Sequence, residues 1–150
     1  MAHDFAILRA DLQQVDTIAP LFDAYRHFYR QAPDLEHARE FIKDRLARSE
    51  SVIFLAVREG IGLGFAQLYP SFSSVDMKRL WILNDLFVTP SARMQGIGAA
   101  LLERARQLAI ETGAQGLMLE TAVDNITAQC LYERLGWRRE VDFYTYYLYL

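Results

Sequence analysis

The sequence lacks several features that define whole classes of protein. Its single cysteine, Cys130, excludes an intramolecular disulfide framework and favours a reducing compartment. No apolar run approaches the roughly 18 residues that cross a membrane. The first residues carry no charged and apolar signal-peptide pattern. We therefore expect a cytoplasmic protein with no membrane partner.

Concentrated positive charge is also missing. The formal net charge is −3, from 16 Lys and Arg against 19 Asp and Glu, and no basic run exceeds a pair. A nucleic-acid partner requires a basic face, so none is expected. The histidines His3, His27 and His37 do not stand at metal-ligand spacing, which predicts no metal site.

The 150 residues, 52% of them hydrophobic, are enough for one domain with its own core, so we expect a single domain over residues 1–150. Apolar periodicity predicts strands and helices in the order β-α-α-β-β-β-α-β-α-β-β. The expected strands are Phe5–Arg9, Val52–Val57, Gly62–Tyr69, Arg79–Val88, Gly116–Thr121, Trp137–Arg139 and Phe143–Leu150. The expected helices start near Asp16 and Asp34 and span Gly96–Thr112 and Thr127–Leu135, with a Ser-rich loop over Pro70–Asp76. Three consecutive strands exclude a simple doubly wound sheet and favour a mixed sheet with helices on both faces.

A glycine loop joins the strand Arg79–Val88 to the helix that follows it. The loop carries Arg93, Gly96 and Gly98 and opens directly into the helix N-terminus. Glycines free their N–H groups, and a helix N-terminus attracts anions, so the loop is a candidate phosphate site or else only a tight turn. The Lys-Ser/Thr pair of a P-loop and the third glycine of a dinucleotide fingerprint are both absent.

Two motifs together are more specific than this loop alone. The segment Arg93–Gly98 matches R/Q-x-x-G-x-G/A, and Asn125 precedes a segment Leu131–Trp137 of the form L-Y-x-x-x-G-W. On these motifs and their order the whole chain resembles the GNAT family of N-acetyltransferases. The resemblance implies an α/β (α+β) fold with a mixed, mostly antiparallel sheet of six to seven strands and four helices on both faces. It also implies an acetyl-CoA-dependent enzyme.

The resemblance assigns roles to residues of both motifs. The loop amides would hold the CoA diphosphate, the strand end would pair with the pantetheine arm, and one strand amide would polarise the thioester carbonyl. Tyr132 would be the catalytic acid for the departing thiolate, or would simply pack in the core. The implied cofactor-binding residues are Leu86, Phe87, Val88, Arg93, Met94, Gln95, Gly96, Ile97, Gly98, Ala99, Asn125 and Ala128.

The sequence defines the residues that would bind the acceptor amine less clearly than those that would bind the cofactor. Asn84 stands where the diamine-acetylating branch of the family has Glu, and an amide cannot take a proton. Asp85 remains as the candidate catalytic carboxylate, which would hold the cationic substrate or act through water, or would only form a salt bridge with an arginine such as Arg79.

Tyr29, Asn84 and Glu120 are the candidate substrate-binding residues, with Glu120 as a second candidate base. The expected partner is a small-molecule primary amine. The alternatives are a non-catalytic acyl-CoA-binding module and an acetyltransferase of protein N-termini or lysines. The Tyr-rich segment Phe143–Leu150 is a candidate homodimer interface.

Overall fold

The computed structural model describes residues 4–150, which fall into two compact units. The first unit ends at Leu119 and the second spans Glu120–Leu150. Each unit is described by itself, and the single domain expected for residues 1–150 stays a prediction.

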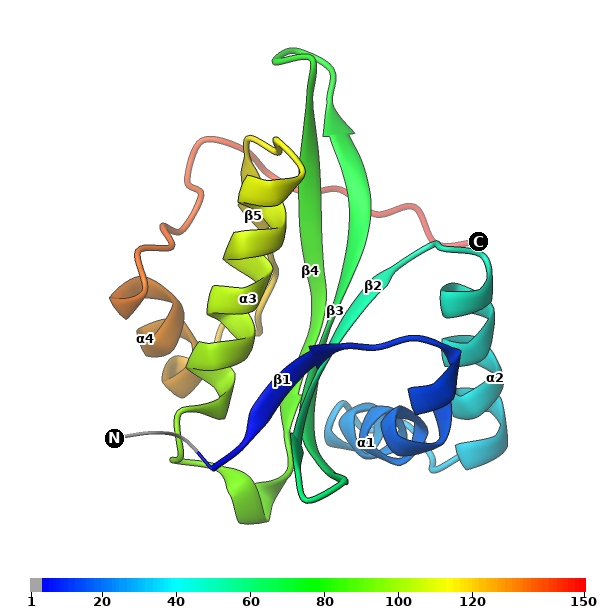
Figure 1. The fold of residues 1–150 in the computed structure, drawn as a ribbon. Helices are drawn as coiled ribbons and strands as arrows, with labels where there is room; N and C mark the ends of the chain where they lie inside the picture. Colours follow the sequence, from blue (N-terminus) through cyan, green and yellow to red (C-terminus); the bar gives the residue numbers. More distant parts are fainter. Residues whose placement is uncertain (1–3) are drawn as a thin grey trace. The chain divides into compact units, whose positions relative to one another are not determined.

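The first unit contains a five-stranded mixed sheet in the order β1-β2-β3-β4-β5 (Figure 1). Neighbours among the first four strands are antiparallel, whereas β5 runs parallel to β4. This topology is the expected mixed, mostly antiparallel sheet, but the expected count of six to seven strands is not confirmed. The strands are β1 (Ala6–Arg9), β2 (Val52–Arg58), β3 (Ile61–Ser73), β4 (Lys78–Val88) and β5 (Gly116–Met118).

Helices cover both faces of this sheet (Figure 1). On one face lie α1 (Val15–Phe28) and α2 (Leu35–Ala47), which bury Ile18, Phe22 and Ile42 against the sheet. On the other face lies α3 (Ile97–Glu111). Because both faces are covered, β2 reads as a continuous apolar run, Val-Ile-Phe-Leu-Ala-Val, rather than an alternating one.

A β-bulge in β4 changes which face each side chain occupies. Gln67 of β3 pairs with Asp85, but its neighbour Leu68 pairs with Leu83, so Asn84 is an extra residue. Trp81 lies before the bulge and donates from Nε1 to Thr112 Oγ1 at the end of α3, 2.9 Å away. Phe87 lies after it and packs in the core under α1 and α2. Residues 81 and 87 would share a face in a regular strand, and the bulge places them on opposite faces.

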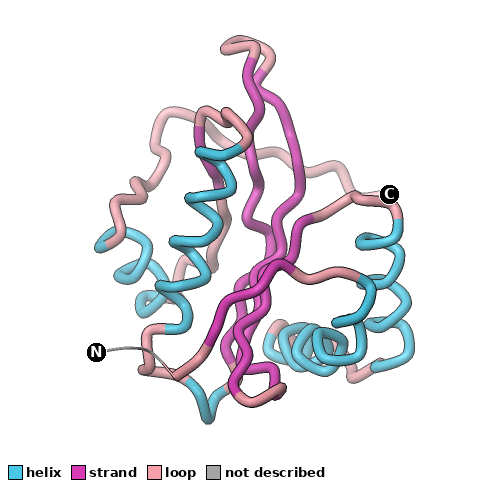
Figure 2. The backbone as a smooth tube through the Cα atoms, in the orientation of Figure 1, coloured by secondary structure: helices cyan, strands magenta, loops and turns pink. Residues whose placement is uncertain are grey.

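The Ser-rich loop expected over Pro70–Asp76 is largely wrong. Strand β3 continues to Ser73 and β4 begins at Lys78, so most of that segment is a long hairpin arm with a short turn (Figure 2). Strand β5 is also shorter than the expected Gly116–Thr121, since it pairs with β4 only as far as Met118.

The second unit contains one helix, α4 (Ile126–Arg134). The Asn125 side chain caps it by accepting from the Ala128 N–H at 3.2 Å. The strands expected over Trp137–Arg139 and Phe143–Leu150 are not formed among the described residues. Alternating aromatic residues give a segment strand propensity, but a strand exists only where a partner strand accepts its hydrogen bonds. The homodimer expected through this segment stays a prediction.

Gly64 fits between β3 and β4 only because it has no side chain. A Cβ built there would lie 2.6 Å from the Phe87 carbonyl oxygen, which is backbone and cannot move aside. Gly64→Ala should therefore lower the free energy of unfolding by about 1–3 kcal/mol, measured by urea denaturation. Gly116→Ala on β5 is the matched control, because its Cβ meets nothing within 4 Å, and it should stay within about 0.5 kcal/mol. Equal losses in the two variants would contradict the steric account.

Candidate active site

The second half of β4 has an open edge. Strand β5 pairs only with Leu80–Ile82, so from Leu83 onward β4 has no strand partner on that side within residues 4–150. The Thr89 N–H donates to the Leu63 carbonyl at 2.8 Å, which makes this a hydrogen-bonded pair of the β3–β4 ladder. Hydrogen-bonded pairs alternate along an antiparallel ladder, so Leu86 and Val88 direct their N–H and C=O groups to the open edge.

The loop after β4 is an arrangement of unpaired amides. Met94 and Gly96 have positive φ angles of 65° and 82°, and Gly96 is the residue before α3. The first amide of this helix with a recorded backbone acceptor is Ala100, which donates to the Gly96 carbonyl at 3.0 Å. The N–H groups of Ile97, Gly98 and Ala99 therefore stand free at the positive end of the helix dipole. Such amides fit the diphosphate of CoA.

Side chains anchor this loop at both ends. The Arg93 Nε donates to the Val88 carbonyl at 3.0 Å, and its guanidinium lies 5.8 Å from the centre of the Phe87 ring. The Gln95 Oε1 accepts from Arg58 Nη2 at 2.7 Å. The loop is therefore tied both to the open edge of β4 and to the end of β2, which holds its amides in place before any ligand binds.

Asp85 is buried at the bulge, with 5% of its surface exposed. Its Oδ2 accepts from Gln67 Nε2 at 2.7 Å and its Oδ1 accepts from Asn84 Nδ2 at 3.0 Å. Burial raises the pKa of the Asp85 carboxyl above its ordinary value, while the hydrogen bonds from Gln67, Asn84 and Tyr25 lower it. A carboxyl with a raised pKa is suited to accept a proton near neutral pH.

Aromatic residues of α1 lie beside this carboxyl. The Tyr25 hydroxyl is 3.4 Å from the Asn84 carbonyl oxygen, and the Tyr25 ring lies 5.0 Å from that of Tyr29, centre to centre. Burial and the nearby charge of Asp85 raise the pKa of Tyr25 above its ordinary value, and the same causes raise the pKa of Tyr69 to about 12. Both phenols are therefore neutral at physiological pH. Tyr29, whose ring contacts that of Tyr25, is about half-exposed to solvent.

The remaining candidate residues belong to the second unit. Tyr132 on α4 is half-buried and lies 6.1 Å, ring centre to ring centre, from Trp137. Asn125 and Ala128 are joined by the helix cap. Glu120 accepts from the Tyr147 hydroxyl at 3.2 Å. The catalytic role of Tyr132, the cofactor roles of Asn125 and Ala128 and the substrate role of Glu120 stay predictions.

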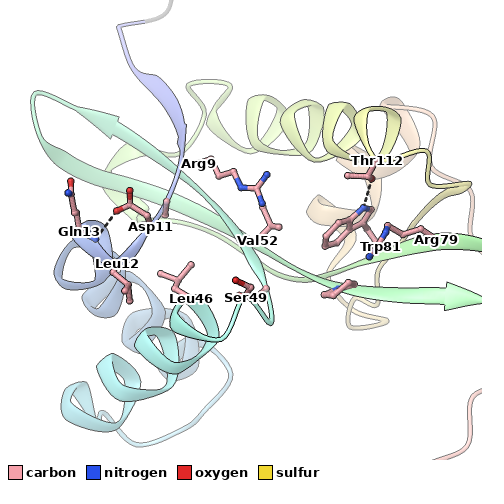
Figure 3. Close-up of a pocket in the computed structure, with 13 residues that line it drawn as sticks. Arg9, Asp11, Leu12, Gln13, Leu46, Ser49, Val52, Arg79, Trp81 and Thr112 are labelled. Carbon is pink, nitrogen blue, oxygen red and sulfur yellow. Dashed lines mark hydrogen bonds between the residues drawn. The ribbon is translucent and has the colours of Figure 1, made fainter.

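A cavity of about 980 Å³ lies elsewhere in the first unit (Figure 3). Its walls come from the end of β1, the start of β2, the middle of the β3–β4 arm and the ends of α2 and α3. The lining residues are Arg9, Ala10, Asp11, Leu12, Gln13, Leu46, Ser49, Ser51, Val52, Pro70, Arg79, Trp81 and Thr112. None of the candidate site residues lines it, although Ser51 joins its wall to Gln67 through a hydrogen bond of 2.8 Å.

Sequence reasoning missed Gln67, Ser51 and Tyr25 as parts of the site. A signal was present for Gln67, because it is the one polar residue in the apolar run Leu63–Leu68 and stands two positions from Phe65. A polar side chain on a buried face requires a partner. The partner could not be identified, since the bulge that brings Asp85 opposite Gln67 leaves no mark in the sequence.

The described residues contain neither a metal-binding cluster nor a membrane-spanning helix. Within residues 4–150 no group of three or more His, Cys, Asp or Glu side chains is arranged to hold a metal ion. No helix in the same range is long and apolar enough to cross a membrane.

Comparison with known proteins agrees with this arrangement. Residues 18–137 match the model of the Acetyltransferase (GNAT) family. The chain is 49% identical over 142 residues to the uncharacterized N-acetyltransferase YhfO of Bacillus subtilis, covering 95% of each chain. It is 46% identical, with a TM-score of 0.92 and 97% of each chain covered, to a probable acetyltransferase of known crystal structure. The fold also matches the aminoglycoside N-acetyltransferase AAC(6')-Iy in complex with CoA, with a TM-score of 0.79, 18% identity and 97% of each chain covered.

These matches define an acyltransferase, and the chain belongs to the GNAT family. It is an acetyl-CoA-dependent N-acetyltransferase, as the two motifs predict.

Because folding raises the pKa of Asp85, ionisation of this carboxyl lowers the free energy of unfolding. The carboxyl is neutral in both states below the unfolded pKa of about 3.9, and its burial cost develops as pH rises through the higher folded pKa. Asp85→Asn should therefore gain stability relative to the wild type as pH is raised from 4 to 8, measured by urea denaturation. Asp44→Asn, at an exposed position of α2, is the control for the loss of one negative charge at the surface. If the difference in the free energy of unfolding between Asp85→Asn and the wild type did not change with pH, the raised pKa of Asp85 would be contradicted.

Proposed function

We propose that this enzyme acetylates a primary amine of a small molecule by direct attack on the thioester of acetyl-CoA. The observation that carries the proposal is Asp85, a buried carboxyl at the bulge where the open edge of β4 begins. When bound, acetyl-CoA supplies a thioester whose carbonyl carbon is open to attack by an unprotonated amine. The chain's own groups bind the cofactor and move the protons.

The cofactor would be held along β4 and at the start of α3. The free amides of Ile97, Gly98 and Ala99 would bind its diphosphate, and the edge groups of Leu86 and Val88 would pair with its pantetheine arm. An amide of that edge would donate to the thioester oxygen as negative charge develops on it. AAC(6')-Iy, a protein of the same fold, is known in complex with CoA, which supports CoA as the ligand of this fold.

Asp85 would act as the general base. An alkylammonium has a pKa of about 10.4 and cannot attack until it loses a proton. Asp85 would take that proton, after which the C–N bond forms and the C–S bond breaks. The nitrogen would lose a second proton, which replaces the proton that Tyr132 gives to the thiolate. One proton per turnover would then leave Asp85 for solvent, so both residues return to their starting states.

The surroundings of Asp85 favour a slender cationic acceptor. Only 5% of the surface of Asp85 is exposed, so a primary amine on a narrow arm would reach it more easily than a crowded one. The aromatic rings of Tyr25 and Tyr29 lie 5.0 Å apart, centre to centre, and would interact with an approaching ammonium through their faces. Asn84 adds a polar backbone carbonyl and an amide without adding charge.

The glycine loop can be tested without the acceptor. Gly96→Ala places a Cβ on a residue with φ of 82°, which costs about 1–2 kcal/mol in the loop conformation. The Kd for acetyl-CoA, measured by isothermal titration calorimetry, should rise about tenfold. Gly113→Ala is the matched control, because φ there is 67° and a Cβ meets nothing within 4 Å. It should lose similar stability and keep its Kd, and equal affinity losses would contradict the binding role of the loop.

Thiol release from acetyl-CoA tests the reaction and its acceptor. A panel of diamines, aminoglycosides and amino-acid amides should support turnover, and a peptide with a free N-terminus and lysine should not. Tyr132→Phe should lower kcat about 100-fold with little change in acetyl-CoA affinity, because it removes the acid and keeps the ring. Acetyl-CoA binding without turnover on any amine would favour the non-catalytic module. Turnover on the peptide alone would contradict a small-molecule acceptor.

A further inference from the structure

Three buried polar side chains in the first unit form a chain of two consecutive hydrogen bonds. Among the described residues only Ser51, Gln67 and Asp85 are polar or charged side chains that are buried. Ser51 Oγ donates to Gln67 Oε1 at 2.8 Å, and Gln67 Nε2 donates to Asp85 Oδ2 at 2.7 Å. Gln67 itself has no exposed surface, so it makes no contact with solvent, acceptor or cofactor from its present position.

We propose that Gln67, oriented by Ser51, is a positioning residue that holds the Asp85 carboxyl and sets its affinity for a proton. The proposal rests on the proposed function, in which Asp85 is the general base. It adds two residues to the site that act through Asp85 and not on the substrate.

The orientation of the Gln67 amide follows from its two neighbours. An ionised carboxylate only accepts hydrogen bonds, so the NH₂ group of Gln67 must face Asp85. The amide oxygen then faces Ser51, whose hydroxyl donates to it. Asn84 Nδ2 supplies the donor for the second oxygen of Asp85 at 3.0 Å. The buried carboxylate therefore has a donor on each oxygen, which is the condition for keeping a charge in this place.

The same pair also fits the protonated form of Asp85. A neutral carboxyl donates through its O–H, and the Gln67 amide would accept that bond after turning by half a rotation. The Ser51 hydroxyl both donates and accepts, so it would then accept from the amide NH₂. Gln67 therefore keeps a partner on both sides in either protonation state, but its bond to the ionised carboxylate is charge-assisted and stronger, so Asp85 can take and release a proton while Gln67 still favours the ionised form. A fixed donor such as Lys would favour only the ionised form.

The factors that shift the pKa of Asp85 agree with the positioning role of Gln67. Burial raises its pKa, and the hydrogen bond from Gln67 is the first of the effects that lower it again. Without that bond the carboxyl would hold its proton to a higher pH and would be a poorer base at neutral pH.

The test is the pH dependence of kcat/KM in Gln67→Leu and Ser51→Ala. Loss of the donor should move the acidic limb of the profile upward by roughly one pH unit in Gln67→Leu, with a smaller shift in Ser51→Ala. The plateau at high pH should stay within about threefold of the wild type, because Asp85 is ionised there in every variant. Ser71→Ala is the matched control, since Ser71 lies four residues along β3 with no recorded side-chain hydrogen bond, and its profile should not move.

A second readout does not depend on turnover. The ¹³C chemical shift of the Asp85 carboxyl, assigned with Asp85→Asn, should titrate at higher pH in both variants than in the wild type. An unshifted kinetic limb and carboxyl titration in the folded variants would overturn the role of Gln67. Ser51→Ala keeps the test decisive if Gln67→Leu does not fold. Full activity of Asp85→Asn would instead overturn the base assigned under the proposed function, so the two failures are distinguishable.

Discussion

The extra residue at Asn84 is the constraint on which the candidate site depends. Trp81 faces α3 and Phe87 faces α1, although a regular strand would put both on one side. The bulge therefore turns Asp85 toward the α1 face, where the aromatic residues lie. The pairing of β4 with β5 ends just before it, at Ile82, so the carboxyl stands where the open edge begins. The bulge thus sets the direction of the Asp85 side chain, and the end of the pairing with β5 leaves the adjoining edge of β4 open.

Keeping a carboxylate at such a place has a cost that the surrounding polar groups reduce. Asp85 is almost fully buried beside two phenols that stay neutral, so desolvation raises its pKa. Donors on both of its oxygens offset part of the penalty, and none of these donors carries a charge. A nearby Arg or Lys would hold the carboxyl ionised at all working pH values and remove its use as a base. Burial raises its pKa and these neutral donors lower it again, which would suit the proposed role of taking and releasing a proton.

Much of the fold and of the cofactor loop could be predicted from sequence because those features are local. The glycine spacing, the helix after it and the Asn125 cap each depend on a few consecutive residues. The bulge, the Gln67–Asp85 contact and the role of Tyr25 depend on strand register and helix packing, which no local pattern specifies. The C-terminal strands show the opposite error. Phe143–Leu150 has strong strand propensity, yet propensity alone supplies no partner for its hydrogen bonds.

Arg93 shows how the two parts of the cofactor site are linked. A simple electrostatic interpretation of the motif makes it a charge at the rim of the anion site. Its Nε instead donates to the Val88 carbonyl, and its guanidinium lies near the Phe87 ring. In the proposed binding mode the helix amides would supply most of the positive potential at the loop, and Arg93 ties the loop to the β4 edge. The distance between the loop and that edge matters, because a diphosphate and a thioester joined by one pantetheine arm must reach both places at once. Arg93 also occupies the Val88 carbonyl at the open edge, so in the proposed binding mode Val88 would offer only its N–H to the ligand.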